Sequence, residues 1–262
     1  MPGSPWLGPI VVVAGFDRLP FVVEYRDSQL IDGELADIIA LRRFQWRNAL
    51  RDIRDSLTTE SGSFPSLSYF ESVPSYFITH PEVDVDPCTP IEEWKLSEVG
   101  RGRAACLASL GWTNQLDRII TSTEHKAKEA GAILSSLTGL AFTADTRLCE
   151  NDRSSTGFLP PAEFEATADQ FFAYPNLSVR GWETAAQAQR RIVAAIRHLS
   201  SDSAISTAFV AHGAVGTLLF CDLMGMPISR EHDQPGQGSY FEFDPQIWTA
   251  SHSWRRIEPG GL

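Results

Sequence analysis

The 262-residue chain has few cysteines, and it lacks both a long apolar run and a secretory start. Its four cysteines are far apart and include no CxxC pair; they are Cys88, Cys106, Cys149 and Cys221. This spacing fits reduced thiols and argues against a zinc finger. No run is long enough to cross a membrane, and the first residues lack the basic and apolar segments of a secretory signal. We therefore expect a cytoplasmic protein.

Positive charge is also scarce, since 22 Lys and Arg residues face 33 Asp and Glu residues, for a formal net charge of -11. Such a chain repels nucleic-acid phosphates and anionic membranes, so we expect neither as a partner. An anionic substrate would need a locally positive pocket. Hydrophobic residues make up 43% of the chain, which is enough for a sizeable core in one large domain, with or without an appendage.

The first 70 residues contain no Lys, His or Cys and differ in this from the rest of the chain. Their pattern predicts two short strands at 8–16 and 19–25, an amphipathic helix at 34–57 and then a linker. We find no recognisable chemistry in this region. We interpret residues 1–70 as an extension of unknown role and residues 71–262 as the main domain.

Strand and helix patterns alternate from residue 76 onward. We expect strands at 76–80, 118–122, 140–145 and 204–212, and antiparallel edge strands at 240–244 and 247–258. We expect helices at 94–112, 123–139, 161–175, 182–200 and 213–225, with Ser97 as a cap of the first and Gly139 closing the second. This alternation predicts an α/β fold, a three-layer sandwich in which helices flank a mostly parallel central sheet.

Two histidines follow buried strands in the same way. His80 ends the strand YFITH, and His212 ends AISTAFVAH immediately before a helix that begins at Gly213. Ligands of open α/β sheets bind at the carboxyl ends of the strands, where helix amides also attract anions. One such histidine is more often a structural residue, but two in matching positions favour a shared site, and phosphate is the ligand that fits best.

Several segments between Tyr76 and Ser253 resemble, in the same order, the motifs of the histidine phosphatase superfamily, also called phosphoglycerate-mutase-like. These segments are ITHPE at 78–82, LSEVGRGRA at 96–104, ITSTEHKAKEAGAIL at 120–134, RLCEND at 147–152, GWET at 181–184 and FVAHGAVGTLL at 209–219. The resemblance implies a metal-independent phosphatase that needs no cofactor and acts on a small phosphomonoester.

The resemblance also implies roles for individual residues. His80 would attack phosphorus and form a phosphohistidine, Glu150 would act as general acid and base, and His212 would stabilise charge on the phosphoryl oxygens. The substrate-binding residues would be Thr79, Ser122, Lys126, Arg153, Glu183 and Gly213.

Three positions depart from the family pattern. Thr79 replaces the arginine and Pro81 the glycine of the first Arg-His-Gly motif, and Lys126 replaces a second arginine. Arginine binds phosphate through a bidentate fork, so both usual phosphate clamps are weakened or absent.

These departures leave other functions open. A catalytically weak module that binds a phosphorylated ligand or a partner is one alternative, and a phosphomutase is another. A metallohydrolase is more distant, because no HxxE or HxH spacing is present. The identity of the substrate and association into a homo-oligomer also stay open.

Overall fold

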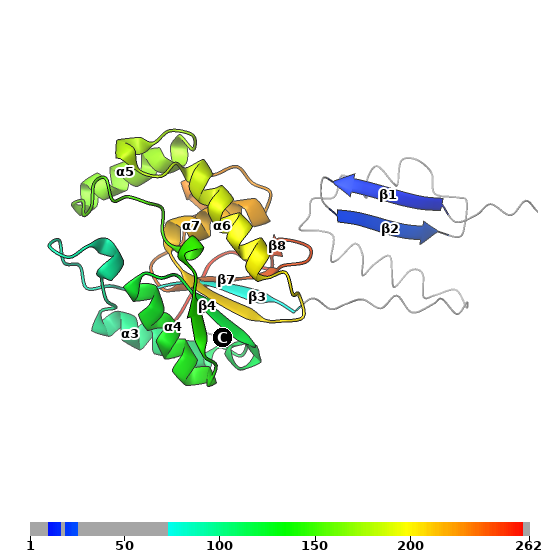
Figure 1. The fold of residues 1–262 in the computed structure, drawn as a ribbon, viewed down its shortest axis with the longest axis horizontal. Helices are drawn as coiled ribbons and strands as arrows, with labels where there is room; N and C mark the ends of the chain where they lie inside the picture. The colour runs from blue at the N-terminus through cyan, green and yellow to red at the C-terminus, as the bar shows by residue number, and fades with distance from the viewer. Residues whose placement is uncertain (1–9, 17–18, 26–72, 259–262) are drawn as a thin grey trace, which may run out of the picture. The chain divides into compact units, whose positions relative to one another are not determined.

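The computed structural model of the protein describes residues 10–16, 19–25 and 73–258 (Figure 1). Strands β1 (Ile10–Phe16) and β2 (Leu19–Tyr25) pair antiparallel, with Ile10 opposite Tyr25. These strands lie within the two segments, 8–16 and 19–25, where we expected strands. The expected helix at 34–57 and the linker after it lie outside the described residues, and the main-domain boundary at 71 stays a prediction.

A seven-stranded sheet forms the centre of the main domain. Its strands are β3 (Ser75–Thr79), β4 (Arg118–Thr121), β5 (Phe142–Ala144), β6 (Thr207–Ala211), β7 (Ser239–Asp244), β8 (Thr249–Ala250) and β9 (Arg255–Arg256). Their order is β5-β4-β6-β3-β7-β8, and β9 also pairs with β7. The first four strands are parallel and the others antiparallel, which confirms the mostly parallel sheet.

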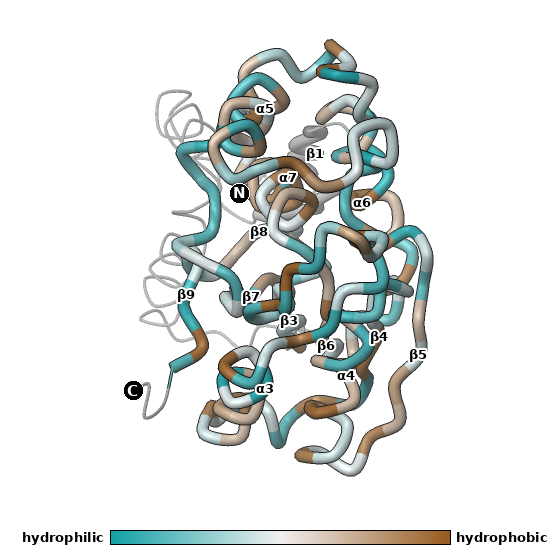
Figure 2. The backbone as a smooth tube through the Cα atoms, turned by 90° about the vertical axis from the view of Figure 1, so that its left-hand side faces the viewer, coloured by the Kyte–Doolittle hydropathy of each residue, from teal (hydrophilic) through white to brown (hydrophobic). Residues whose placement is uncertain are grey.

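Helices cover both faces of this sheet. The α-helices are α3 (Glu98–Ala105), α4 (His125–Thr138), α5 (Pro161–Ala173), α6 (Ala185–Leu199) and α7 (Gly213–Leu223). Short 3-10 helices are η2 (Ile91–Glu93), η3 (Cys106–Ser109), η4 (Thr113–Gln115), η5 (Thr146–Leu148), η6 (Val179–Gly181) and η7 (Arg230–His232). Helices α3 and α4 lie on one side of β3, β6 and β4, and α5, α6 and α7 lie on the other (Figures 1 and 2). The expected three layers are confirmed.

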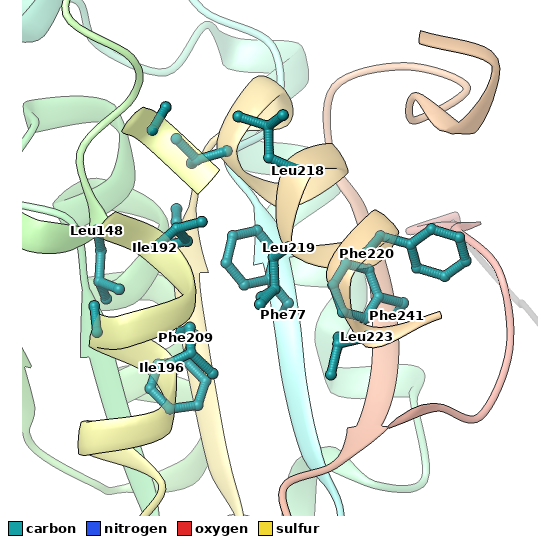
Figure 3. Close-up of a cluster of buried hydrophobic side chains, with 14 of the residues drawn as sticks. Phe77, Leu148, Ile192, Ile196, Phe209, Leu218, Leu219, Phe220, Leu223 and Phe241 are labelled. Atoms are coloured by element: carbon teal, nitrogen blue, oxygen red, sulfur yellow. The ribbon is translucent and has the colours of Figure 1, made fainter. Parts of the chain in front are cut away.

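Each face of the sheet has its own core, because successive strand residues point to opposite sides. Phe77 of β3 and Phe209 of β6 pack with α6 and α7, in the cluster drawn in Figure 3. Their neighbours Ile78 and Val210 pack with α3 and α4 on the other face. The central strands are therefore buried on both sides, which explains their continuous apolar sequences.

The helix ends are set by residues that the sequence identifies. The Ser97 side chain accepts the backbone N–H of Gly100 at the start of α3, and Gly139 closes α4 at a φ of 75°. Thr184 and Gln187 form a reciprocal capping box at the start of α6. Gly139 thus fixes where α4 ends, and α4 carries Lys126 toward the site.

Two expected elements differ from the structure. The expected helix at 94–112 is α3 followed by the 3-10 turn η3, a common way for a helix end to tighten. The expected single strand at 247–258 is two short strands, β8 and β9. Both strands pair with β7, where Phe243 lies opposite Ala250 and Tyr240 lies opposite Arg255. The segment that joins β8 to β9 is therefore two residues longer than the facing segment of β7, and these residues bulge out.

Within the described ranges, no helix combines the length and the apolar character needed to cross a membrane.

Candidate active site

The two histidines lie at the carboxyl ends of adjacent parallel strands. Thr79 of β3 lies opposite Ala211 of β6, so the residues that follow, His80 and His212, are neighbours. The His80 backbone N–H donates to the Ala211 carbonyl at 3.0 Å. The ring centroids are 5.2 Å apart at an interplanar angle of 68°, and both residues are buried. The structure thus brings the two buried imidazoles together.

The contacts of His80 determine its tautomer. Nδ1 lies 2.8 Å from the carbonyl oxygen of Pro81, which can only accept a hydrogen bond, so Nδ1 carries the proton. Burial, the His212 ring and the Lys126 ammonium together hold the pKa of His80 well below its usual value. The imidazole is therefore neutral, and the lone pair on Nε2 is available.

His212 is fully buried and is held through Nε2. This atom lies 2.8 Å from Ser122 Oγ and 3.3 Å from Glu124 Oε1. Because a carboxylate only accepts, the proton lies on Nε2. Burial and the nearby cationic side chains of Lys126, Arg153 and Arg191 hold the pKa of His212 well below its usual value. Its Nδ1 is buried with no hydrogen-bond partner.

Glu150 follows the turn η5 and lies against the start of α7. Its carboxylate accepts the backbone N–H groups of Ala214 at 3.2 Å and Val215 at 3.0 Å. These helix amides, which we expected to bind phosphate, are therefore occupied by Glu150. Burial raises the pKa of Glu150, and the charge of Glu124 acts in the same direction; Arg153 and the two amides oppose the shift.

Lys126 projects from the first turn of α4 into the buried site, with 3% of its side chain exposed. Its Nζ donates to the Ile91 carbonyl at 2.9 Å and forms an ion pair with Glu124. Lys126 is thus a buried cation, not a solvated helix residue. Burial of this ammonium without a carboxylate partner would raise the free energy of the folded state, which explains why Glu124 lies next to it.

Two arginines lie near the site in different environments. The Arg153 guanidinium stacks over Phe164 at 5.1 Å from the ring centroid, and no ion pair joins it to any acidic residue of the described ranges. Arg191 is fully engaged, since it binds the Glu183 carboxylate at 2.7 Å and the carbonyls of residues 147, 149 and 150. Glu183 is therefore committed to Arg191 and contacts neither imidazole.

Thr79 stands in a hydrogen-bonded network with the loop after η7. Its hydroxyl donates to Gln234 Oε1 at 2.5 Å and accepts the Ser239 N–H at 3.0 Å. The Thr79 hydroxyl is thus used within the protein, and the expected contact with substrate has no support from this geometry. The Gln234 amide lies close over Gly213, because a Cβ there would be 2.3 Å from Gln234 Nε2. A larger residue at position 213 would require the Gln234 side chain to move.

A cavity of about 460 Å³ adjoins the site on the side of Glu150. It is lined by Thr146, Cys149, Glu150, Asp152, Glu183, Gln187 and Arg191. Neither histidine lines this cavity. Nowhere in the described residues do three or more His, Cys, Asp and Glu side chains converge in a way that would hold a metal ion.

Among the expected site residues, the structure groups His80, His212, Ser122, Lys126 and Glu150, with Arg153 beside them. Sequence reasoning missed two further residues. Glu124 lies two residues before Lys126, but the burial of Lys126, which explains why Glu124 is there, is not visible in the sequence. Gln234 lies in a polar loop where no spacing pointed to the site.

The chain is similar to known proteins in both sequence and fold. The model of the histidine phosphatase superfamily, branch 1, matches residues 80–252. Solved structures with the same fold include a mycobacterial glucosyl-3-phosphoglycerate phosphatase, with 20% identity, a TM-score of 0.57, and coverage of 71% of this chain and 97% of that chain. They also include YhfR of Bacillus stearothermophilus, with 22% identity, a TM-score of 0.59, and coverage of 69% and 94%.

A phosphoserine phosphatase from Entamoeba histolytica is a third such structure, with 16% identity, a TM-score of 0.54, and coverage of 65% of this chain and 89% of that chain. The search of curated proteins found no match. The family match spans more than half of the chain and includes both buried histidines. The chain therefore belongs to the histidine phosphatase superfamily.

Proposed function

We propose that the protein is a metal-independent phosphatase that hydrolyses a small phosphomonoester through a phosphohistidine on His80. The observation that carries this proposal is the state of His80: its Nδ1 proton is held by the Pro81 carbonyl, which leaves the Nε2 lone pair of a neutral, buried imidazole free. A neutral imidazole in this tautomer is a nucleophile.

The reaction has two steps. In the first, His80 Nε2 bonds to phosphorus while the bond from phosphorus to the leaving oxygen breaks, and Glu150 gives its proton to that oxygen. In the second, water attacks phosphorus, the nitrogen–phosphorus bond breaks, and Glu150 takes up a proton from the water. The raised pKa of Glu150 supports this exchange, because it increases the fraction of protonated carboxyl.

Charge on the phosphoryl oxygens needs positive partners. His212 provides Nε2–H, and Lys126 and Arg153 provide cations close enough to depress the pKa of His212. Arg153 is the best substitute for the missing arginines, since no carboxylate of the described chain pairs with it. Structures of the mycobacterial phosphatase with inorganic phosphate and with vanadate support a small phosphorylated ligand.

A turnover assay tests this proposal. Purified protein is given a generic aryl phosphate in excess chelator, together with His80→Ala, His212→Ala and the exposed control His125→Ala. We expect chelator-resistant turnover in the native chain and in His125→Ala, loss of turnover in His80→Ala, and a decrease of about 10²- to 10³-fold in His212→Ala. Sensitivity to chelator, or equal turnover in His80→Ala, would reject it.

A second function, a module that binds phosphorylated ligands without turnover, is favoured by one observation. The Glu150 carboxylate occupies two α7 amides, and the Thr79 hydroxyl is bound to Gln234. Fewer donors are therefore free to stabilise a transition state. Binding of phosphate without turnover on a broad panel of phosphomonoesters would establish this function.

A further inference from the structure

The Glu124 carboxylate lies among the groups that would bind the phosphoryl oxygens. One of its oxygens pairs with Lys126 Nζ. The other accepts the Glu150 backbone N–H at 2.8 Å and lies 3.3 Å from His212 Nε2. Only 10% of the Glu124 side chain is exposed. A buried carboxylate thus contacts an ammonium, an imidazole N–H and a backbone amide at once.

Capping of α4 does not explain this arrangement. Glu124 is the residue before the first turn of α4, but its side chain makes no capping hydrogen bond. The carboxylate instead turns away from the helix amides, toward His212 and residue 150. The Glu124 backbone is held separately, because its N–H donates to Ser122 Oγ at 3.2 Å. The carboxylate can therefore move by side-chain rotation while the backbone stays in place.

The charges in the pocket oppose a second anion. Lys126 is neutralised by Glu124, and Arg191 by Glu183, while the Glu150 carboxyl lies beside them. A phosphoryl dianion that entered this arrangement would meet two carboxyl groups, and of the cations that the described residues place here, only Arg153 has no ion pair. Like charges at such distances in a buried site repel strongly. The phosphoryl group and the Glu124 carboxylate therefore compete for the same donors.

We propose that the Glu124 carboxylate is an internal anion that occupies the phosphoryl-binding donors, and that a phosphorylated ligand binds by displacing it from Lys126, His212 and the Glu150 amide. This inference rests on the proposed function, because it concerns the same pocket. Inorganic phosphate has no other group whose contacts could offset the free energy of displacing the Glu124 carboxylate. It therefore binds weakly to the native chain. Glu124 thus favours phosphomonoesters whose remaining part makes contacts of its own.

Calorimetric titration of the full chain with inorganic phosphate tests this inference. Glu124→Gln removes the charge and keeps the size, and we expect it to bind phosphate at least about tenfold more tightly than the native chain. Glu124→Ser is the second variant, with the same expected direction. Glu129→Gln is the matched control, because Glu129 lies on α4, pairs with Arg101 and contacts neither histidine. We expect native affinity for it.

The double variant Glu124→Gln/Lys126→Met tests whether the higher phosphate affinity expected for Glu124→Gln comes from Lys126. If the affinity rises because Lys126 is released, this variant binds phosphate no more tightly than the native chain. Circular dichroism of each variant shows whether it is folded. If Glu124→Gln folds, the calorimetric result decides; if it does not, Glu124→Ser takes its place.

Binding and turnover separate this inference from the proposed function. Tighter phosphate binding without any turnover supports the displacement and rejects the phosphatase. Turnover that depends on His80, together with unchanged or weaker phosphate binding in both Glu124 variants, overturns the displacement and leaves the phosphatase intact. Absence of phosphate binding in all proteins also overturns the displacement.

Discussion

The buried imidazoles of His80 and His212 couple proton binding to folding. Burial lowers both pKa values below the ordinary 6.5, so each ring binds its proton more readily in the unfolded chain. Their contribution to the free energy of unfolding is therefore complete above pH 6.5 and is lost as the pH falls below it. Glu150 has a raised pKa, so its effect on stability has the opposite sign. Its contribution to the free energy of unfolding is lost as the pH rises above 4.5.

We predict that His212→Asn reduces the dependence of stability on pH below 6.5. One histidine contributes at most about 1.4 kcal/mol per pH unit, and the variant loses that share while Glu150 remains in both proteins. Urea denaturation at several pH values between about 5 and 7.5 measures the two slopes. Equal slopes for the native chain and the variant would contradict the lowered pKa of His212.

Thr79 shows how a residue at an expected binding position has a structural role. Its hydroxyl links β3 to Gln234 and to the β7 backbone. We predict that Thr79→Val lowers the free energy of unfolding by about 1–3 kcal/mol, because the Ser239 N–H and the Gln234 carbonyl lose a buried partner. Thr79→Ser keeps the hydroxyl and serves as the control. Chemical denaturation measures both, and native stability of Thr79→Val would contradict this network.

Helix α4 depends on close packing for the position of Lys126. A Cβ at Gly131 would lie 2.3 Å from Thr121 Cγ2 of β4, so the helix can approach the strand only with glycine there. We predict that Gly131→Ala lowers the free energy of unfolding by about 1–3 kcal/mol and weakens phosphate binding, because α4 must move away from β4.

Gly102→Ala is the matched control for this prediction. Gly102 also lies inside a helix, α3, but nothing lies within 4 Å of a Cβ placed there. Alanine should therefore stabilise the protein by about 0.5–1 kcal/mol. Thermal or chemical unfolding compares the two variants. If Gly131→Ala were as stable as Gly102→Ala, the close contact between α4 and β4 would be refuted.

The elements that position the site were largely predictable because their signals are local. The apolar runs before His80 and His212 gave β3 and β6, and Ser97 and Gly139 marked real helix ends. The alternation at 247–258 could not show the bulge between β8 and β9, since that depends on pairing with β7. The position of the Glu124 carboxylate could not be predicted either, because two of its partners, His212 and the Glu150 backbone N–H, come from distant parts of the chain.

Across the chain, the family match begins at residue 80, and the expected extension precedes it. The main domain has a hydrophobic core on each face of its sheet, formed by residues from Tyr76 onward. We therefore predict that a chain starting at residue 71 folds and binds phosphate with native affinity. Calorimetric melting and phosphate titration check this. A large loss of thermal stability or of affinity would show that the first 70 residues complete the domain or its site.

The central claim is that His80 becomes covalently phosphorylated. The most direct measurement mixes the protein with an aryl phosphate, stops the reaction in alkaline detergent after a fraction of a turnover, and maps the phosphate on peptides by mass spectrometry. We predict phosphate on the peptide that contains His80, stable in base and lost in acid, and absent from His80→Ala. Turnover with phosphate on another residue, or with no phosphoprotein at any quench time, would contradict the account.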